Sequence, residues 1–160
     1  MGDWEIVEEE LLVAKLKARG MTCATAESCT GGGVGAAITA VPGASEVFMG
    51  GVISYDNSVK RDVLGVSAEI LETVGPVSAQ CAAQMAKGAR DLLKTDLAVS
   101  VTGLAGPGGD GVHPAGYVWF GVASPQGVIT ENKIFPGDRA AVRAAAVRHA
   151  ISLLLASAHK

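Results

Sequence analysis

The sequence predicts an α/β fold: a single three-layer domain in which helices flank a mixed, mostly parallel sheet. Apolar runs of strand length alternate along the chain with segments of helical periodicity, a pattern typical of layered α/β domains. Two late strand-like runs are separated only by Pro125-Gln126-Gly127, which predicts a hairpin and so a mixed sheet. The length of 160 residues fits one domain, and we find no internal repeat or linker, so residues 1–160 are taken as one unit.

The first half of the chain is expected to hold two strands and four helices. Apolar residues recur at helical spacing at Trp4, Val7, Leu11, Leu12 and Leu16, and Gly20 is a natural helix stop. The expected elements are a helix up to Gly20, strands over 21–26 and 51–55, and helices over 34–39, 57–64 and 67–73.

The second half has clearer boundaries. Ser78 and Asp138 are good N-cap residues for two longer helices, because their side chains can accept hydrogen bonds from the first free N–H groups. The expected elements are a helix over 78–93, a buried strand over 97–101, a glycine-rich loop over 103–116, strands over 117–123 and 128–135, and a helix over 138–155.

Composition narrows the class of protein. The net charge is −3, with 13 Lys and Arg against 16 Asp and Glu, so a basic surface for nucleic acid is not expected. No apolar run approaches the ~18 residues that span a bilayer, and the acidic start is unlike a signal peptide. We therefore expect a cytoplasmic protein with no nucleic-acid or membrane partner. High apolar content with few charges favours a homo-oligomer.

Three cysteines, an odd number without a Cys-x-x-Cys pair, are typical of a reducing compartment. They argue against a zinc ribbon or a disulfide framework. No metal site is expected.

A small polar cluster, Glu27-Ser28-Cys29-Thr30, joins the first strand to Gly31-Gly32-Gly33 and a helix. The N-terminus of a helix presents unpaired N–H groups that stabilise anions and oxyanions, so a hydroxyl at this junction can face a substrate. The same pattern also fits a plain N-cap at Ser28 or Thr30. Cys29 is an alternative nucleophile, but none of the histidines has an evident tie to it, and a thiolate needs such a base.

Tyr55 lies at the end of the second expected strand, and Lys60 falls one turn into the next helix. A serine needs a base, and a desolvated lysine can supply one because burial lowers its pKa. Tyr55 could relay a proton or orient Lys60. Considered alone, the two residues also fit a solvated lysine beside a packed tyrosine.

A third segment, Thr102 to Gly109, opens a buried strand into a glycine-rich loop at its C-terminal end. Ligands of α/β sheets bind at such ends, and consecutive glycine N–H groups can form an anion nest. A phosphate group is the expected ligand, although the segment does not match the Walker motif.

Several segments in the same order resemble the CinA C-terminal domain family, over roughly residues 5–156. The matching segments are Ala26–Gly32, Val41–Ser45, Phe48, Gly51, Tyr55–Asn57, Lys60, Leu64–Val66, Gly75–Ser78, Met85–Ala86, Thr102–Pro107, Pro114–Gly116, Gly137–Arg139 and Arg143. His113 departs from the family pattern, since it stands where relatives often carry lysine.

The resemblance implies an amidohydrolase that converts nicotinamide mononucleotide to nicotinate mononucleotide and ammonia, in pyridine nucleotide salvage, without a cofactor. It assigns Ser28, Tyr55 and Lys60 as catalytic residues. The expected substrate-binding residues are Thr30, Gly31, Gly32, Thr102, Gly103, Gly106 and Arg143. The alternative is a non-catalytic regulatory module related to competence and DNA damage, which would have no need of all three catalytic residues.

Overall fold

The computed structural model describes residues 7–158, which form one five-stranded sheet with helices on both faces. The elements are α1 (Glu8–Arg19), β1 (Cys23–Glu27), α2 (Gly33–Thr39), the 3₁₀ turn η1 (Ala44–Glu46), β2 (Phe48–Ile53), α3 (Asn57–Asp62), α4 (Ala68–Glu72), α5 (Ala79–Leu93), β3 (Leu97–Gly103), β4 (Tyr117–Ser124), β5 (Gly127–Ile134) and α6 (Arg139–Ser157). Trp4, expected in the first helix, lies outside the described residues.

The strand order is β2-β1-β3-β4-β5. The strands β2, β1 and β3 run parallel, and β3-β4 and β4-β5 pair antiparallel. The predicted hairpin is thus present at one edge of the sheet, and the α/β fold with a mixed sheet is confirmed.

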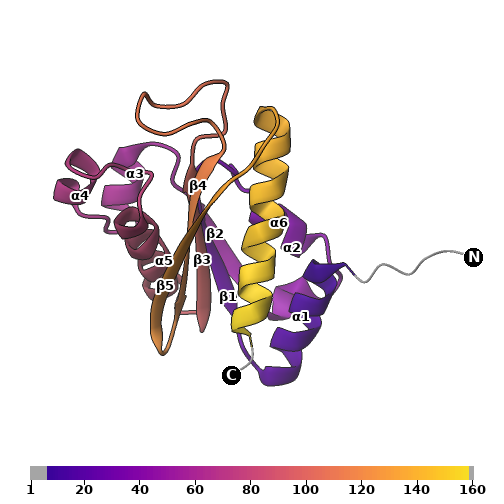
Figure 1. Cartoon of the computed structure of the whole chain (residues 1–160). Helices are drawn as coiled ribbons and strands as arrows, with labels where there is room; N and C mark the ends of the chain where they lie inside the picture. Colours follow the sequence, from indigo (N-terminus) through magenta and orange to yellow (C-terminus); the bar gives the residue numbers. More distant parts are fainter. Residues whose placement is uncertain (1–6, 159–160) are drawn as a thin grey trace, which may run out of the picture.

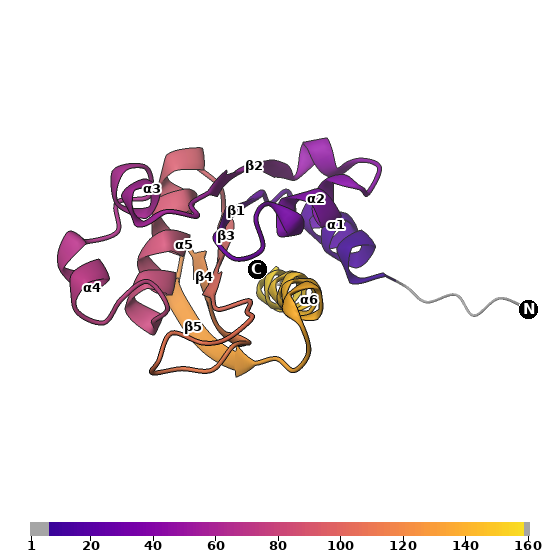
Figure 2. The same ribbon diagram turned by 90° about the horizontal axis from the view of Figure 1, so that it is seen from above.

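The sheet separates two groups of helices (Figures 1 and 2). Helices α3, α4 and α5 lie on one face, and α1, α2 and α6 lie on the other. Along β1 the side chains alternate between the two cores: Ala24 and Ala26 pack with Met85 of α5, whereas Cys23 packs with the core of α1 and α6. Every residue of β1 is buried because both faces of this strand are covered.

Caps set most helix boundaries where the sequence predicts them. The side chains of Ser78 and Asp138 accept hydrogen bonds at the starts of α5 and α6, and Gly20 ends α1 with a φ of 64°. The second strand is the exception. We expected it over 51–55, but β2 begins at Phe48 and ends at Ile53, because Cys23 pairs with Phe48 and the chain turns away after the Ser54 N–H donates to the Glu27 carbonyl.

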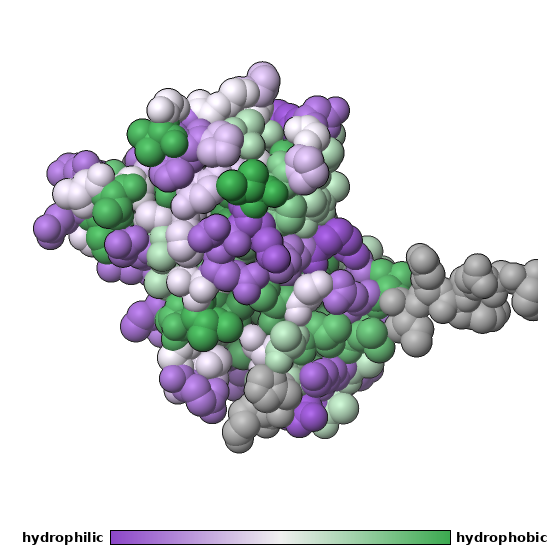
Figure 3. Space-filling model, in the orientation of Figure 1, coloured by the Kyte–Doolittle hydropathy of each residue, from purple (hydrophilic) through white to green (hydrophobic). Residues whose placement is uncertain are grey.

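One described helix, α6, is long and apolar enough to cross a membrane by length and composition alone. Its buried side chains, including Val142, Ile151 and Leu154, pack in the core of this globular domain instead. Apolar surface is exposed elsewhere, for example on the edge strand β5, where Ile129 and Ile134 are more than half exposed; Figure 3 shows hydrophobic patches on this side of the molecule.

Candidate active site

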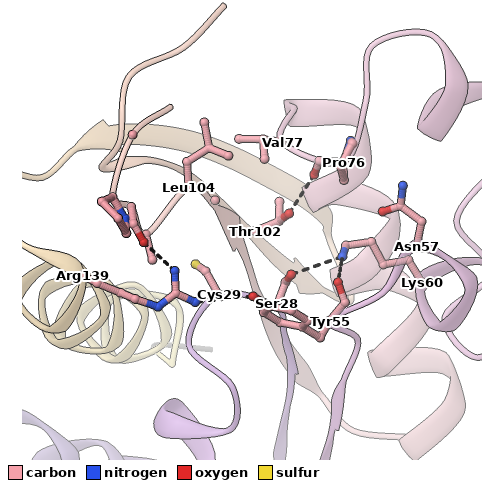
Figure 4. A pocket seen from close by; sticks show the side chains of 15 residues that line it. Ser28, Cys29, Tyr55, Asn57, Lys60, Pro76, Val77, Thr102, Leu104 and Arg139 are labelled. Carbon is pink, nitrogen blue, oxygen red and sulfur yellow. Dashed lines mark hydrogen bonds between the residues drawn. The ribbon is translucent and has the colours of Figure 1, made fainter. Parts of the chain in front are cut away.

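The three parallel strands end at a common cavity of about 330 Å³. Ser28 follows β1, Tyr55 follows β2, and Thr102 lies near the end of β3, so each strand delivers one polar residue to the carboxyl edge of the sheet. The cavity is drawn in Figure 4. Its lining residues are Ser28, Cys29, Tyr55, Asn57, Lys60, Pro76, Val77, Thr102–Gly108 and Arg139.

Ser28 is held by the strands on either side of its own. Its backbone N–H donates to the Val101 carbonyl of β3 at 2.9 Å, and the preceding carbonyl, that of Glu27, accepts from the Ser54 N–H at 2.7 Å. Because successive side chains along an extended chain alternate, Glu27 points toward α2 and Ser28 points into the cavity. The serine hydroxyl is therefore carried on rigid backbone.

Lys60 lies in the short helix α3, which is capped by the Asp56 side chain accepting from the Ser58 N–H. The lysine is only 2% exposed. Its Nζ donates to the carbonyls of Ser54 at 2.7 Å and Tyr55 at 3.1 Å, and it lies 3.2 Å from Ser28 Oγ. The structure thus brings the predicted base and nucleophile into hydrogen-bond contact (Figure 4).

The surroundings of Lys60 disfavour its charged form. Burial lowers the pKa of Lys60 from its ordinary value of 10.5, and the nearby carboxylate of Asp56 offsets this lowering only in part. No carboxylate is among the described residues that line the cavity. A buried lysine whose hydrogen-bond partners are two carbonyls and a hydroxyl is suited to act as a base.

Tyr55 contributes to the site through two different groups. Its carbonyl binds Lys60, whereas its hydroxyl lies 3.4 Å from a guanidinium nitrogen of Arg139. The residue is 64% exposed and forms one wall of the cavity. The backbone, and not the phenol, is the part of Tyr55 that orients Lys60.

Glu27 organises the turn that follows Ser28, a role that the sequence did not reveal. Its buried carboxylate accepts from the Thr30 hydroxyl at 2.7 Å and from the N–H groups of Val34 at 2.8 Å and Gly35 at 3.0 Å. The first N–H groups of α2 are therefore already satisfied. The helix terminus that we expected to stabilise an oxyanion is occupied by the protein's own carboxylate.

Three residues predicted to bind substrate do not line the cavity: Thr30, Gly31 and Gly32. The Thr30 hydroxyl is turned to Glu27, and the Gly31 N–H donates to the Ser28 carbonyl at 3.1 Å. Gly31 and Gly32 have φ values of 59° and 101°, a left-handed conformation that other residues rarely adopt. Their observed contribution is to reverse the chain between β1 and α2.

Arg143, predicted to lie near a phosphate, also stands outside the cavity. Its Nε donates to the Cys29 carbonyl at 3.1 Å, and one terminal nitrogen donates to the Thr30 carbonyl at 3.3 Å. These bonds tie α6 to the turn after Ser28. In the structure Arg143 supports this turn from outside the cavity.

The loop after β3 does line the cavity, with Thr102, Gly103 and Gly106 among its residues. The Thr102 hydroxyl donates to the Pro76 carbonyl at 2.7 Å, so its lone pairs remain for a hydrogen-bond donor. His113, in the same loop, stacks on Tyr117 with ring centroids 4.2 Å apart and is not a lining residue.

Cys29 lines the cavity next to Ser28 but is 5% exposed. Burial raises the pKa of its thiol to about 11, so the thiol stays protonated at neutral pH. Serine is thus the better candidate nucleophile.

Arg139 is a charged cavity residue that the sequence pattern did not single out. The pattern places it only at the start of the last helix, yet its guanidinium donates to the Gly106 carbonyl at 2.6 Å and faces the cavity (Figure 4). Its position directly after Gly137-Asp138, at the start of a helix, is the feature of the sequence that could have indicated a role in the site.

Comparison with known proteins agrees with the fold and with the family resemblance of the sequence. The family model described as the CinA C-terminal domain matches residues 6–158. A CinA-like protein of Pseudothermotoga lettingae is 42% identical over 97% of this chain, and one of a Synechococcus species is 47% identical over 90%. These matches cover 38% and 35% of the relatives, so the chain spans just over a third of their length.

Solved structures of similar size also match. The competence/damage inducible protein CihA from Agrobacterium tumefaciens superposes with a TM-score of 0.90 at 39% identity, covering 98% of both chains. A CinA superfamily protein from Klebsiella pneumoniae gives 0.91 at 37% identity, covering 94% of this chain and 95% of that one. The chain belongs to the CinA C-terminal domain family.

Proposed function

We propose that this domain is a cytoplasmic amidohydrolase that converts nicotinamide mononucleotide to nicotinate mononucleotide and ammonia. The observation that carries the proposal is the contact between Lys60 Nζ and Ser28 Oγ at 3.2 Å, in a cavity without a carboxylate among its described lining residues. Such a pair can form an acyl-enzyme without a histidine.

The hydrogen bonds of Lys60 suit a neutral amine. A neutral Nζ has two hydrogens and one lone pair; the carbonyls of Ser54 and Tyr55 can take the hydrogens, which leaves the lone pair for the Ser28 hydroxyl. Lys60 then removes the proton from Oγ while Oγ forms a bond to the carboxamide carbon. The resulting ammonium is held by the same three oxygens.

The remaining steps return the enzyme to its starting state. The carbon–nitrogen bond of the tetrahedral intermediate breaks, and the Lys60 ammonium gives its proton to the departing ammonia. In the sequence-based hypothesis Tyr55 assists this transfer. Water, deprotonated by neutral Lys60, then attacks the ester carbon, and Ser28 leaves with the proton. The net reaction is amide plus water giving carboxylic acid and ammonia.

Ammonia release from nicotinamide mononucleotide by the purified protein tests the proposal. We expect release by the wild type and by Cys29→Ala, and a loss of at least about 10³-fold in Ser28→Ala, because removal of a nucleophile disables the covalent route. Full activity in folded Ser28→Ala would rule out the serine. If the folded wild type releases no ammonia, the substrate is another amide or the domain is a regulatory module.

A further inference from the structure

The charge of the cavity differs in sign from that of the chain. The protein carries a net charge of −3, yet the charged residues among the described lining of the cavity are two cations, Lys60 and Arg139. A cavity lined by charges of one sign attracts ligands of the opposite charge. If Lys60 is neutral when it acts as a base, the positive charge of the site rests on Arg139.

Arg139 is placed to receive an anion. It is the first residue of α6, its side chain is exposed, and it reaches the Gly106 carbonyl at 2.6 Å and the Tyr55 hydroxyl at 3.4 Å. These contacts use two of the five guanidinium donors, and the others remain for a ligand. Figure 4 shows Arg139 across the cavity from Lys60, beside the loop. The acidic neighbour Asp138 is engaged as the N-cap of α6.

The loop beside Arg139 adds a second group of donors. Gly106 and Gly108 line the cavity and have φ values of 93° and 75°. Pro107 between them has no N–H group, so this turn can offer an anion the separate N–H groups of Gly106 and Gly108. A planar guanidinium next to such a turn matches the oxygen atoms of a phosphate monoester.

We propose that Arg139 determines specificity by binding the phosphate of the nucleotide substrate. The inference rests on the proposed function, since it takes the 5′-phosphate of nicotinamide mononucleotide as the anion. Arg143, one helical turn further on, has a different role: it donates to the carbonyls of Cys29 and Thr30 and is not itself among the lining residues.

Binding to a protein that cannot turn over separates this inference from the reaction itself. Ser28→Ala would be titrated by calorimetry with nicotinamide mononucleotide and with nicotinamide riboside, which lacks the phosphate. We expect about 10- to 100-fold tighter binding of the mononucleotide, as for hydrogen bonds to a charged group. Adding Arg139→Gln should reduce this ratio to within about threefold, and Arg139→Lys should restore part of it.

Two matched variants in the same Ser28→Ala background distinguish charge recognition from a structural role. Arg143→Gln and Arg148→Gln should both keep the mononucleotide preference, because Arg143 holds backbone carbonyls, Arg148 pairs with Glu9, and both variants leave Arg139 intact. An unchanged ratio in Arg139→Gln, a ratio lost equally in Arg143→Gln, or no binding of the mononucleotide at all would overturn the inference. Selective binding without ammonia release by the wild type would overturn the proposed reaction alone. Thermal unfolding verifies that each variant is folded.

Discussion

Two buried ionisable side chains, Glu27 and Lys60, lie near the carboxyl ends of the parallel strands, and their hydrogen-bond environments are opposite. Glu27 is 1% exposed and is surrounded by donors: the Thr30 hydroxyl and the N–H groups of Val34 and Gly35. Lys60 is 2% exposed and contacts two carbonyls and a hydroxyl, without a carboxylate. The first environment satisfies a negative charge, whereas the second favours loss of a positive one.

This difference in environment indicates that Glu27 stabilises the fold, whereas Lys60 is suited to take part in the reaction. Three donors make Glu27 the organiser of the turn between β1 and α2. The desolvated Lys60 keeps a lowered pKa because nothing in its contacts compensates fully for burial. Substitutions at the two positions should therefore affect different quantities.

The largest expected effect is on activity at Lys60. Lys60→Met should lower kcat by about 10²- to 10⁴-fold, the usual range for a lost general base, while thermal stability changes little, because relief from burying a charged amine is offset by the loss of its hydrogen bonds to the Ser54 and Tyr55 carbonyls. Lys87→Met is the control, since Lys87 is exposed on α5 and paired with Asp91. Steady-state kinetics and thermal unfolding check both. A destabilised but fully active Lys60→Met would reverse the comparison.

At Glu27, by contrast, we expect a substitution to lower the stability of the fold. Glu27→Ala leaves one hydroxyl, the buried N–H of Val34 and the partly buried N–H of Gly35 without their acceptor, so we expect a loss of about 3–5 kcal/mol in the free energy of unfolding. Glu46→Ala, which removes an exposed pair with Lys17, should cost at most about 1 kcal/mol. Urea denaturation measures both, and equal losses would contradict the role assigned to Glu27.

The lowered pKa of Lys60 predicts how both activity and stability depend on pH. Because burial lowers the pKa of Lys60 below 10.5, kcat/KM should rise about tenfold per pH unit up to a break below that value. The lowered pKa of the folded state also means that the cost of burying the ammonium is fully present below this pKa and is relieved as pH rises through it. The stability of Lys60→Met relative to the wild type should therefore fall as pH rises through this range. A break at or above 10.5 would reject a desolvated base.

The smallest effect is expected at the Tyr55 phenol. Tyr55→Phe keeps the carbonyl that binds Lys60 and removes only the contact with Arg139, so kcat should fall by less than about tenfold. Tyr117→Phe, whose phenol accepts from the Trp119 indole outside the cavity, is the matched control. A loss near 10³-fold at Tyr55 would support a proton relay through its hydroxyl instead.

The sequence by itself determined the fold class and most helix boundaries, whereas the pairing of Ser28 with Lys60 was implied only by the family resemblance. Strand and helix periodicity carry the information on the fold locally, and parallel strands necessarily present their ends at one edge. The start of β2 was less well predicted because the pairing of Phe48 with Cys23 is not a local signal.

Only the tertiary structure decided which polar groups face the cavity. Arg139 and Arg143 are four residues apart and so lie on one side of α6, and no local pattern says that the first reaches Gly106 while the second holds Cys29. The same holds for Thr30, whose hydroxyl is taken by Glu27. Hydrogen bonds between distant segments depend on how the layers pack, because packing fixes the distances that a sequence pattern leaves open.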